Sequence, residues 1–235
     1  MIQEYSAYTD EDFAVWKVLY NRQMEILPKL AAKEYLDALK VVNFTGDRIP
    51  HFDEVNKLLG EYTGWKIDVV PNIIPVEVFF PKLERRTFGA TTWLRKMSEL
   101  DYLEEPDMFH DVFGHVPLLS NETFCAFFHG LSKIAIQHLD NPEVLEKLGR
   151  MYWFTIEFGL IRESGNLKIY GAGIMSSHGE TKYSVSNEPT HLPFDVEKIL
   201  NTTYNNMVIQ DTYFVIDSFE QLFESLGEIE AIVSK

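Results

Sequence analysis

The sequence contains a single cysteine, which excludes two kinds of structural crosslink. With Cys125 as the only thiol among 235 residues, no disulfide can form within the chain and no thiolate cluster can bind zinc. We therefore expect a reducing, cytoplasmic setting. Cys125 itself lies in an aromatic run, where we expect it to be buried as a small hydrophobic side chain.

Basic residues are also scarce. The chain has 21 lysines and arginines against 36 aspartates and glutamates, which gives a formal net charge of -15. A nucleic-acid-binding protein needs a basic surface to displace the counterions of phosphates, and binding to an anionic membrane needs the same sign of charge. We therefore expect neither nucleic acid nor a membrane among the partners.

Long apolar runs and flexible linkers are missing as well. No window approaches the apolar length needed to cross a bilayer, and the first residues lack the basic and apolar regions of a signal peptide. There is no internal repeat and no Gly/Ser-rich linker, while 46% of the residues are hydrophobic and 14% are aromatic. These features predict a single domain over residues 1–235 with a sizeable core.

The spacing of apolar residues predicts a mostly α fold with a minor β component. We expect helical stretches after Thr9, after Pro28, over residues 50–62, 120–139 and 142–161, and from Phe194 and Ser218 to the end. Residues 65–93 alternate β-branched side chains with prolines, which predicts extended segments and turns, and residues 208–216 resemble a strand. The glycine- and serine-rich residues 165–185 predict an irregular segment.

Two histidines five residues apart are the first sign of chemistry. On a straight helix, at roughly 100° per residue, His110 and His115 would point about 140° apart. They could converge only if the helix ends or bends between them, which Gly114 and Pro117 would permit. Alone, two histidines at this spacing are more often one packed and one exposed side chain than joint metal ligands.

A third ligand is suggested by Glu157, the only charged residue between Arg150 and Arg162 in an aromatic stretch. A buried carboxylate there would need a partner, although a single solvent-facing position on a helix would leave the same pattern. Two imidazoles and one carboxylate would make the facial triad of non-haem iron(II) oxygenases. Zinc is disfavoured because the zincin pattern, with histidines four apart around a glutamate, is missing.

Two other iron chemistries have weaker support in the sequence. A 2-oxoglutarate-dependent oxygenase would use His51 and Asp53 with His178 or His191, but that chemistry is normally built on a β-barrel-like core, and Asp53 resembles a helix N-cap. A di-iron bundle would need two Glu-x-x-His turns. The one present, from Glu188 to His191, contains a proline that disrupts the helical turn.

Several long blocks together resemble a known family, the pterin-dependent aromatic amino acid hydroxylases. The signature blocks are residues 110–118 (HDVFGHVPL), 152–160 (YWFTIEFGL) and 170–177 (YGAGIMSS). Residues 91–95 and 101–107 are most similar to the bacterial members that hydroxylate phenylalanine. The resemblance spans residues 8–223 and implies the family's catalytic-domain basket, without the regulatory domain or tetramerisation helix of animal members. A monomer is therefore expected.

The resemblance also implies roles for individual residues. The catalytic metal ligands would be His110, His115 and Glu157. The substrate-binding residues would be Arg95, Pro106, Trp153, Phe158, Gly173 and Ser176, with Arg95 binding the substrate carboxylate. The pterin would contact Phe79, Ile74, Asp111, Gly149, Tyr152 and Glu180. The alternatives are a surface position for Arg95, core packing for the apolar residues, and a solvated loop charge for Glu180.

The activity that the resemblance implies is ring hydroxylation of an aromatic amino acid with O2, Fe(2+) and a tetrahydropterin such as tetrahydrobiopterin. Phenylalanine, converted to tyrosine, is the expected substrate; tryptophan or tyrosine is the alternative, because residues 205–207 match no family pattern cleanly. Leu103 replaces a threonine of the animal enzymes. A relative that binds an aromatic amino acid or pterin without turnover is the non-enzymatic alternative.

Overall fold

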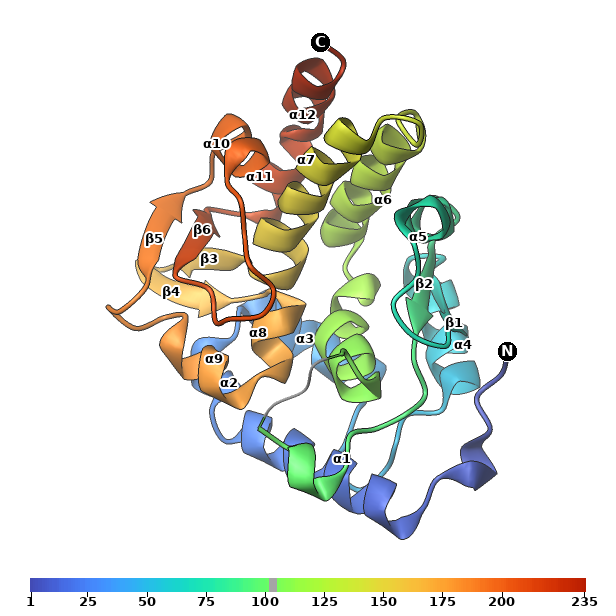
Figure 1. The fold of residues 1–235 in the computed structure, drawn as a ribbon. Helices are drawn as coiled ribbons and strands as arrows, with labels where there is room; N and C mark the ends of the chain where they lie inside the picture. The colour runs from blue at the N-terminus through green and yellow to red at the C-terminus, as the bar shows by residue number, and fades with distance from the viewer. Residues whose placement is uncertain (102–104) are drawn as a thin grey trace.

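The computed structural model describes residues 1–101 and 105–235, so the expectation placed on Leu103 lies outside the described residues. Helices form most of the described chain, and two small sheets form the rest (Figure 1). This confirms the predicted fold class. None of the helices in residues 1–101 and 105–235 has the length and apolar character that a bilayer crossing requires.

The amino-terminal part is a helical layer. Its elements are η1 (Tyr5–Ala7), α1 (Asp10–Met24), α2 (Leu27–Leu30), α3 (Lys33–Val42) and α4 (Phe52–Tyr62). The predicted cap of α1 is confirmed, since the Thr9 hydroxyl accepts from the backbone N–H of Asp12 and the Asp12 carboxylate accepts from that of Thr9. The predicted cap of α4 is wrong. Its N-cap is His51, and Asp53 lies in the first turn, where its charge favours the helix dipole.

Residues 65–93 are only partly extended. The parallel strands β1 (Lys66–Val69) and β2 (Thr87–Ala90) pair with each other, but helix α5 (Val76–Glu84) connects them. The expectation of turns and extended chain across α5 is therefore wrong. Pro81 lies inside this helix, where the burial of Phe80 and Leu83 against the core offsets its unfavourable helix propensity.

The central segments carry the residues of most chemical interest. They are η2 (Met97–Glu99), η3 (Phe109–His115), η4 (Pro117–Ser120), α6 (Glu122–Ile136), α7 (Pro142–Tyr152) and η5 (Trp153–Glu157). Both η3 and η5 are π-helices, a form that is rare and frequent at functional sites. The helix predicted over residues 142–161 is therefore interrupted after Tyr152. Cys125 lies buried in α6, as predicted.

The carboxy-terminal part contains the larger sheet and its covering helices. Its elements are β3 (Leu160–Glu163), β4 (Asn166–Ile169), α8 (Ala172–Ser176), α9 (His178–Tyr183), β5 (Thr190–Pro193), α10 (Val196–Asn201), β6 (Thr212–Ile216), α11 (Phe219–Glu224) and α12 (Leu226–Val233). The strand order is β4-β3-β6-β5, with β3 and β4 antiparallel and the other pairs parallel.

The prediction of an irregular segment over residues 165–185 is wrong. Ser164 and Gly165 both have positive φ and form the two-residue turn between β3 and β4, and two short helices follow. The Ser177 hydroxyl caps the second of these, α9. Serine and glycine serve here as turn and cap residues between regular elements rather than as loop.

The two π-helices are held in place from opposite sides. Tyr35 of α3 donates a 2.6 Å hydrogen bond from its hydroxyl to the backbone oxygen of Phe113, and Trp16 of α1 packs edge-on against Phe109 at a centroid distance of 5.4 Å. These contacts fix η3 to the amino-terminal layer. On the other side, Phe154 packs edge-on against Phe214 of β6 at 5.2 Å, which fixes η5 to the sheet.

Helix α8 closes the arrangement by packing its backbone directly onto η3. A Cβ on Gly114 would lie 2.8 Å from the backbone oxygen of Ala172, so only glycine allows this approach. We predict that Gly114→Ala lowers the free energy of unfolding by about 1–3 kcal/mol, measured by urea denaturation.

The matched control is Gly60→Ala in α4, where a Cβ would meet no atom within 4 Å. Because alanine favours an exposed helix over glycine, this variant should be more stable by roughly 0.5–1 kcal/mol. Equal stability changes in the two variants would contradict the close approach of η3 and α8.

Candidate metal centre

The three predicted ligands lie together. One ligand atom from each of His110, His115 and Glu157 lies within 4.8 Å of the others, and within residues 1–101 and 105–235 no other such group of three is found. The His115 Nε2 atom is 3.0 Å from Glu157 Oε1 and 3.3 Å from His110 Nε2, and His110 Nε2 is 3.7 Å from Glu157 Oε2. One ion can contact all three groups from one side.

The convergence of the two histidines follows from the π-helical turn of η3. A π-helix hydrogen-bonds residue i to i+5, so residues five apart lie one turn from each other on the same face. His110 and His115 have this spacing, and they are the second and last residues of η3. The sequence argument expected a helix end or bend between them; the structure has neither, and a wider turn aligns the two rings instead.

Glu157 ends the second π-helix and is buried beside both histidines. The bond from the Phe158 N–H to the Trp153 oxygen, five residues earlier, is 2.9 Å long and belongs to this wider turn. Burial raises the pKa of Glu157, but the charges of His115 and His110 and hydrogen bonds from His115 and Tyr152 outweigh it and lower the pKa to about 2. The carboxylate is therefore an ionised ligand, not a solvent-facing position.

The orientation of His110 is fixed by Ser176. The Ser176 hydroxyl donates to the backbone oxygen of Ala172 at 3.0 Å, so it accepts from His110 Nδ1–H at 2.9 Å. This leaves the Nε2 lone pair of His110 free to face His115 and Glu157. Such outer hydrogen bonds set the tautomer and the basicity of a metal-binding imidazole. The family resemblance implies that Ser176 lines the substrate side of the site. In this structure Ser176 contacts the metal ligand His110 directly.

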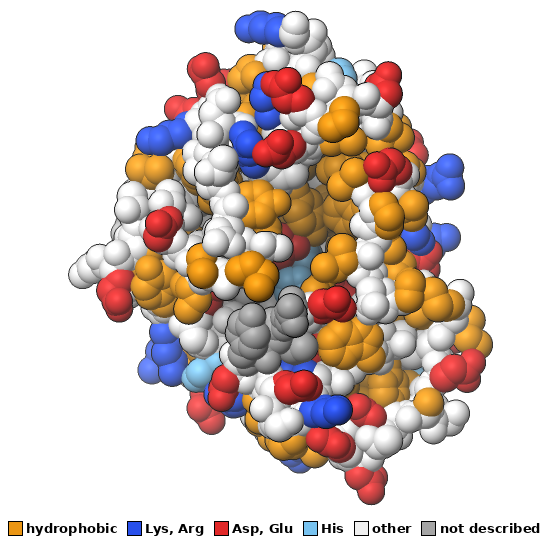
Figure 2. All heavy atoms as spheres, viewed as in Figure 1, with side chains coloured by type: hydrophobic (Ala, Val, Ile, Leu, Met, Phe, Trp, Pro, Cys, Tyr) orange, Lys and Arg blue, Asp and Glu red, His pale blue; other side chains and the backbone are white. Residues whose placement is uncertain are grey.

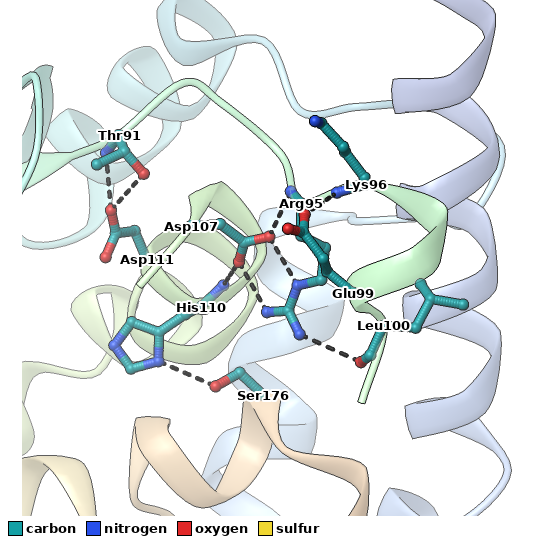
Figure 3. Close-up of polar contacts among 9 residues, drawn as sticks. All are labelled: Thr91, Arg95, Lys96, Glu99, Leu100, Asp107, His110, Asp111 and Ser176. Carbon is teal, nitrogen blue, oxygen red and sulfur yellow. Dashed lines mark hydrogen bonds and ion pairs between the residues drawn. The ribbon is translucent and has the colours of Figure 1, made fainter. Parts of the chain in front are cut away.

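Asp107 connects Arg95 to the metal site, and the sequence argument did not single it out (Figure 3). The Arg95 side chain donates from Nε and Nη2 to the two Asp107 oxygens at 2.8 and 2.9 Å. The backbone N–H of His110 donates to Asp107 Oδ1 at 3.2 Å. Arg95 is therefore not a surface arginine, and its charge is placed beside the ligand helix.

Asp111 faces away from this network. Its carboxylate accepts from the backbone N–H and the hydroxyl of Thr91, at 2.7 and 2.9 Å (Figure 3). Burial raises the pKa of Asp111, partly offset by His110 and by the Thr91 bonds. The carboxylate thus ties the strand end after β2 to the ligand helix η3. The structure shows this positioning contact and leaves a pterin contact as a prediction.

Apolar side chains, most of them aromatic, lie around the three ligands. Trp153 packs on Phe158 at a centroid distance of 4.5 Å, and the Phe158 ring lies against Gly173, where a Cβ would come within 2.7 Å of it. Pro106 is half-buried one residue before Asp107. Figure 2 shows a hollow in this face of the molecule, with a histidine and an acidic side chain at its floor and hydrophobic side chains around it.

The predicted pterin residues form a second wall. Phe79 of α5 packs edge-on against Tyr152 at 5.3 Å, and Tyr152 lies 6.5 Å from the His115 ring. Gly149 precedes Tyr152 by nearly one turn of α7, and a Cβ there would meet no atom within 4 Å. Ile74 lies in the loop before α5, partly exposed. Phe79 and Tyr152 thus connect α5 to the end of α7, with free space beside Gly149.

Glu180 is buried and bonded to residues in and before β6. Its Oε1 accepts from the Tyr213 hydroxyl at 2.6 Å and from the backbone N–H of Gln210 at 3.5 Å, and burial raises its pKa. The solvated-charge alternative is therefore wrong. These contacts hold Glu180 against β6, and its contact with the pterin stays a prediction.

The ligands of the rival iron chemistries do not meet. His51 stacks on Tyr5 at 4.7 Å, and His191 bonds the backbone oxygen of Ser184 at 2.7 Å. Neither belongs to the metal-binding group found in the described part of the chain. The donor set and its geometry instead fit the class of mononuclear non-haem iron enzymes, in which two imidazoles and one carboxylate leave further coordination positions open.

Comparisons with known proteins agree with this class. A family model, biopterin-dependent aromatic amino acid hydroxylase, matches residues 4–235. The phenylalanine-4-hydroxylase of Ralstonia nicotianae is 46% identical over 226 residues, which are 96% of this chain and 72% of that relative. The phenylalanine-4-hydroxylase of Chromobacterium violaceum is 45% identical over 224 residues, 95% of this chain and 75% of that relative.

A solved structure of the Chromobacterium violaceum enzyme holds iron(III) and the oxidised cofactor 7,8-dihydrobiopterin. It matches this structure with a TM-score of 0.94 at 43% identity, covering 100% of this chain and 86% of that one. The chain therefore belongs to the biopterin-dependent aromatic amino acid hydroxylase family, which confirms the resemblance inferred from the sequence blocks.

We predict that Ser176→Ala weakens iron(II) binding about 10–100-fold, because His110 loses the acceptor that fixes its tautomer. Iron affinity would be measured by titration of the metal-free protein. The control is Ser132→Ala in α6, a buried serine whose hydroxyl donates to the backbone oxygen of His129. The same loss of affinity in both variants would contradict a specific role for Ser176.

Proposed function

We propose that this chain is an iron(II)- and tetrahydropterin-dependent monooxygenase that converts phenylalanine to tyrosine with O2. The observation that carries the proposal is the convergence of His110, His115 and Glu157 on one site. The high identity to phenylalanine-4-hydroxylases over nearly the whole chain supports the choice of substrate.

Different side chains would bind the metal, position the two organic molecules and exclude water. Iron(II) and the tetrahydropterin, when bound, supply the electrons and the open coordination positions that activation of dioxygen requires. His110, His115 and Glu157 would hold the metal on one side only. The walls of the hollow would hold the two organic molecules on either side of the open face, so that the reacting atoms start in position. Trp153 and Phe158 would keep water away from the reacting ring.

Arg95 would bind the carboxylate of the amino acid. A guanidinium has five N–H donors. Three of them are used here, two on Asp107 and one, from Nη1, on the backbone oxygen of Leu100 at 3.3 Å. The remaining donors on Nη1 and Nη2 match the two oxygens of a carboxylate. Because Asp107 holds the fork in place, little side-chain entropy would be lost when substrate binds.

The pterin would lie between α5 and α7. Phe79 offers an aromatic face, Tyr152 closes the side toward His115, and the bare backbone at Gly149 gives a flat ring close access to the helix. Asp111 would contact the pterin, as the resemblance implies, and its carboxylate would also hold Thr91 in place.

We also propose that residues 1–235 act as one catalytic domain, as a monomer in a reducing, cytoplasmic setting. In support, nearly all buried apolar side chains of the described residues form one continuous cluster.

The proposed function is tested by turnover of phenylalanine, tyrosine and tryptophan with iron(II), a tetrahydropterin and O2, with the products separated by chromatography. We expect tyrosine from phenylalanine as the preferred reaction. Glu157→Ala should keep its fold but lose bound iron and all turnover, whereas the exposed control Glu143→Ala should keep both.

Each contrary outcome has a distinct meaning. A preference for tryptophan or tyrosine would change the substrate and leave the chemistry. Turnover that depends on 2-oxoglutarate instead of a pterin would replace the reaction class. Binding of amino acid and pterin without any product would identify a non-catalytic relative. Full activity of Glu157→Ala would refute the metal site.

For the pterin site we predict that Gly149→Ala raises the KM for tetrahydropterin about tenfold, because an added methyl group would occupy the space that the ring needs. The KM for the amino acid should stay unchanged. The fold should be slightly more stable, since the methyl meets no protein atom and alanine favours the helix. Gly227→Ala in α12, which is equally unobstructed, is the control.

A further inference from the structure

The loop between α10 and β6, residues 202–211, crosses the outer face of the Trp153 indole. The Tyr204 ring stacks on that indole at a centroid distance of 4.1 Å and an interplanar angle of 9°. The other aromatic contact of the indole among the described residues is Phe158, at 4.5 Å. Trp153 is thus enclosed between Phe158 and the loop, so the loop sets the position of the indole. Figure 1 shows this loop between α10 and β6.

The side chain of Gln210 ties this loop to the indole. The Trp153 Nε1–H donates to Gln210 Oε1 at 3.0 Å, and Gln210 Nε2 donates to the backbone oxygens of Asn205 and Val208, both at 3.1 Å. An indole N–H is only a donor, so the amide oxygen must face it and the NH2 group must face the loop. Every hydrogen-bonding group of this amide is therefore used.

The loop has little else to hold it. Among the described residues, the other hydrogen bond recorded within 205–209 is local, from the Met207 N–H to Asn205 Oδ1. Met207, Val208 and Ile209 are 59%, 59% and 55% exposed. A loop whose apolar side chains face solvent gains no stability from a core of its own, so its conformation depends on its tether.

Gln210 itself is anchored from the other side. It is 7% exposed, and its backbone N–H reaches Glu180, whose carboxylate also accepts from the Tyr213 hydroxyl. Tyr213 is a buried residue of β6, so the anchor belongs to the sheet that supports η5. The contacts therefore run from the sheet through Glu180 and Gln210 to the loop and to Trp153.

We propose that Gln210 is a positioning residue that sets the amino acid preference by holding residues 204–209 against Trp153. This deepens the proposed function and rests on it. With the tether in place, the indole has a fixed distance from Phe158 and the wall fits one ring size. Without it, Tyr204 and Trp153 move freely, and a larger ring is accepted.

The test compares Gln210→Met, Gln210→Glu and the control Gln137→Met, an exposed glutamine at the end of α6. Methionine keeps the length of the side chain but makes none of the three bonds. Glutamate keeps an acceptor for the indole N–H but has no donor for the two backbone oxygens. Glutamate therefore isolates the tether to the loop, and it serves as the second variant if methionine prevents folding.

We expect both Gln210 variants to raise the KM for phenylalanine about tenfold, because glutamate loses two of the three hydrogen bonds and methionine loses all three. The KM for tetrahydropterin and the iron content should stay unchanged. The ratio of kcat/KM for phenylalanine to that for tryptophan should fall about tenfold as well. Gln137→Met should match the parent protein in every respect. An unchanged ratio in folded, active Gln210 variants would overturn the proposal.

Amide hydrogen exchange on the same samples separates this proposal from the proposed function. Residues 204–209 should exchange faster in the Gln210 variants than in Gln137→Met, while η3 and η5 should not change. If exchange in residues 204–209 is unchanged, Gln210 does not hold the loop, and the proposal is refuted even when the enzyme is active. A parent protein that hydroxylates no aromatic amino acid would overturn the proposed function, and with it the role of Gln210 in preference.

Discussion

The structure depends on one buried group whose desolvation is unfavourable, the carboxylate of Glu157 in an aromatic and almost fully apolar segment. A buried carboxylate is unfavourable unless charges or hydrogen bonds compensate for it. His110 and His115 provide that compensation, and a metal cation would provide more. For both rings to reach one carboxylate, η3 must take the wider π-helical turn, and η5 must end against it. The packing of η3 on the amino-terminal helices and of η5 on the sheet serves this requirement.

Asp107 links Arg95, the residue proposed to bind the substrate carboxylate, to the metal ligand His110. Asp107 is fully buried and its two oxygens are shared between the Arg95 fork and the backbone N–H of His110. On the other side of the ring, Ser176 fixes His110 Nδ1. His110 is therefore held by Asp107, which also binds Arg95, and by Ser176 of α8. Movement of the Arg95 guanidinium would therefore disturb η3 through the Asp107 carboxylate.

The metal ligands and the family could be predicted from the sequence, whereas the π-helical turn, helix α5 and two hydrogen-bonded side chains could not. Each failure has a physical cause. The ligands were visible because an isolated charge in an apolar segment and paired histidines are unusual patterns, and the long sequence blocks named the family. The π-helical turn was not visible, because it depends on tertiary packing around Tyr35 and Ala172 rather than on local propensity. Helix α5 was missed because Pro81 outweighs the burial of Phe80 in any local argument. Asp107 was missed because its partner Arg95 lies 12 residues away, and Gln210 because its indole partner lies 57 residues away.

The floor and the rim of the hollow differ in the kind of force that holds them. At the floor, ionised groups are buried and bonded on every side, so a change in one of them affects the metal. At the rim, residues 204–209 are joined to the rest by neutral hydrogen bonds through Gln210 and by one aromatic stack, with exposed side chains at the tip. Neutral bonds at a surface can be rearranged at small energetic cost. In the proposed function, the accepted ring would therefore change through the loop while the metal site stays the same. This would account for residues 205–207, which match no family pattern cleanly in a chain that keeps all three ligands.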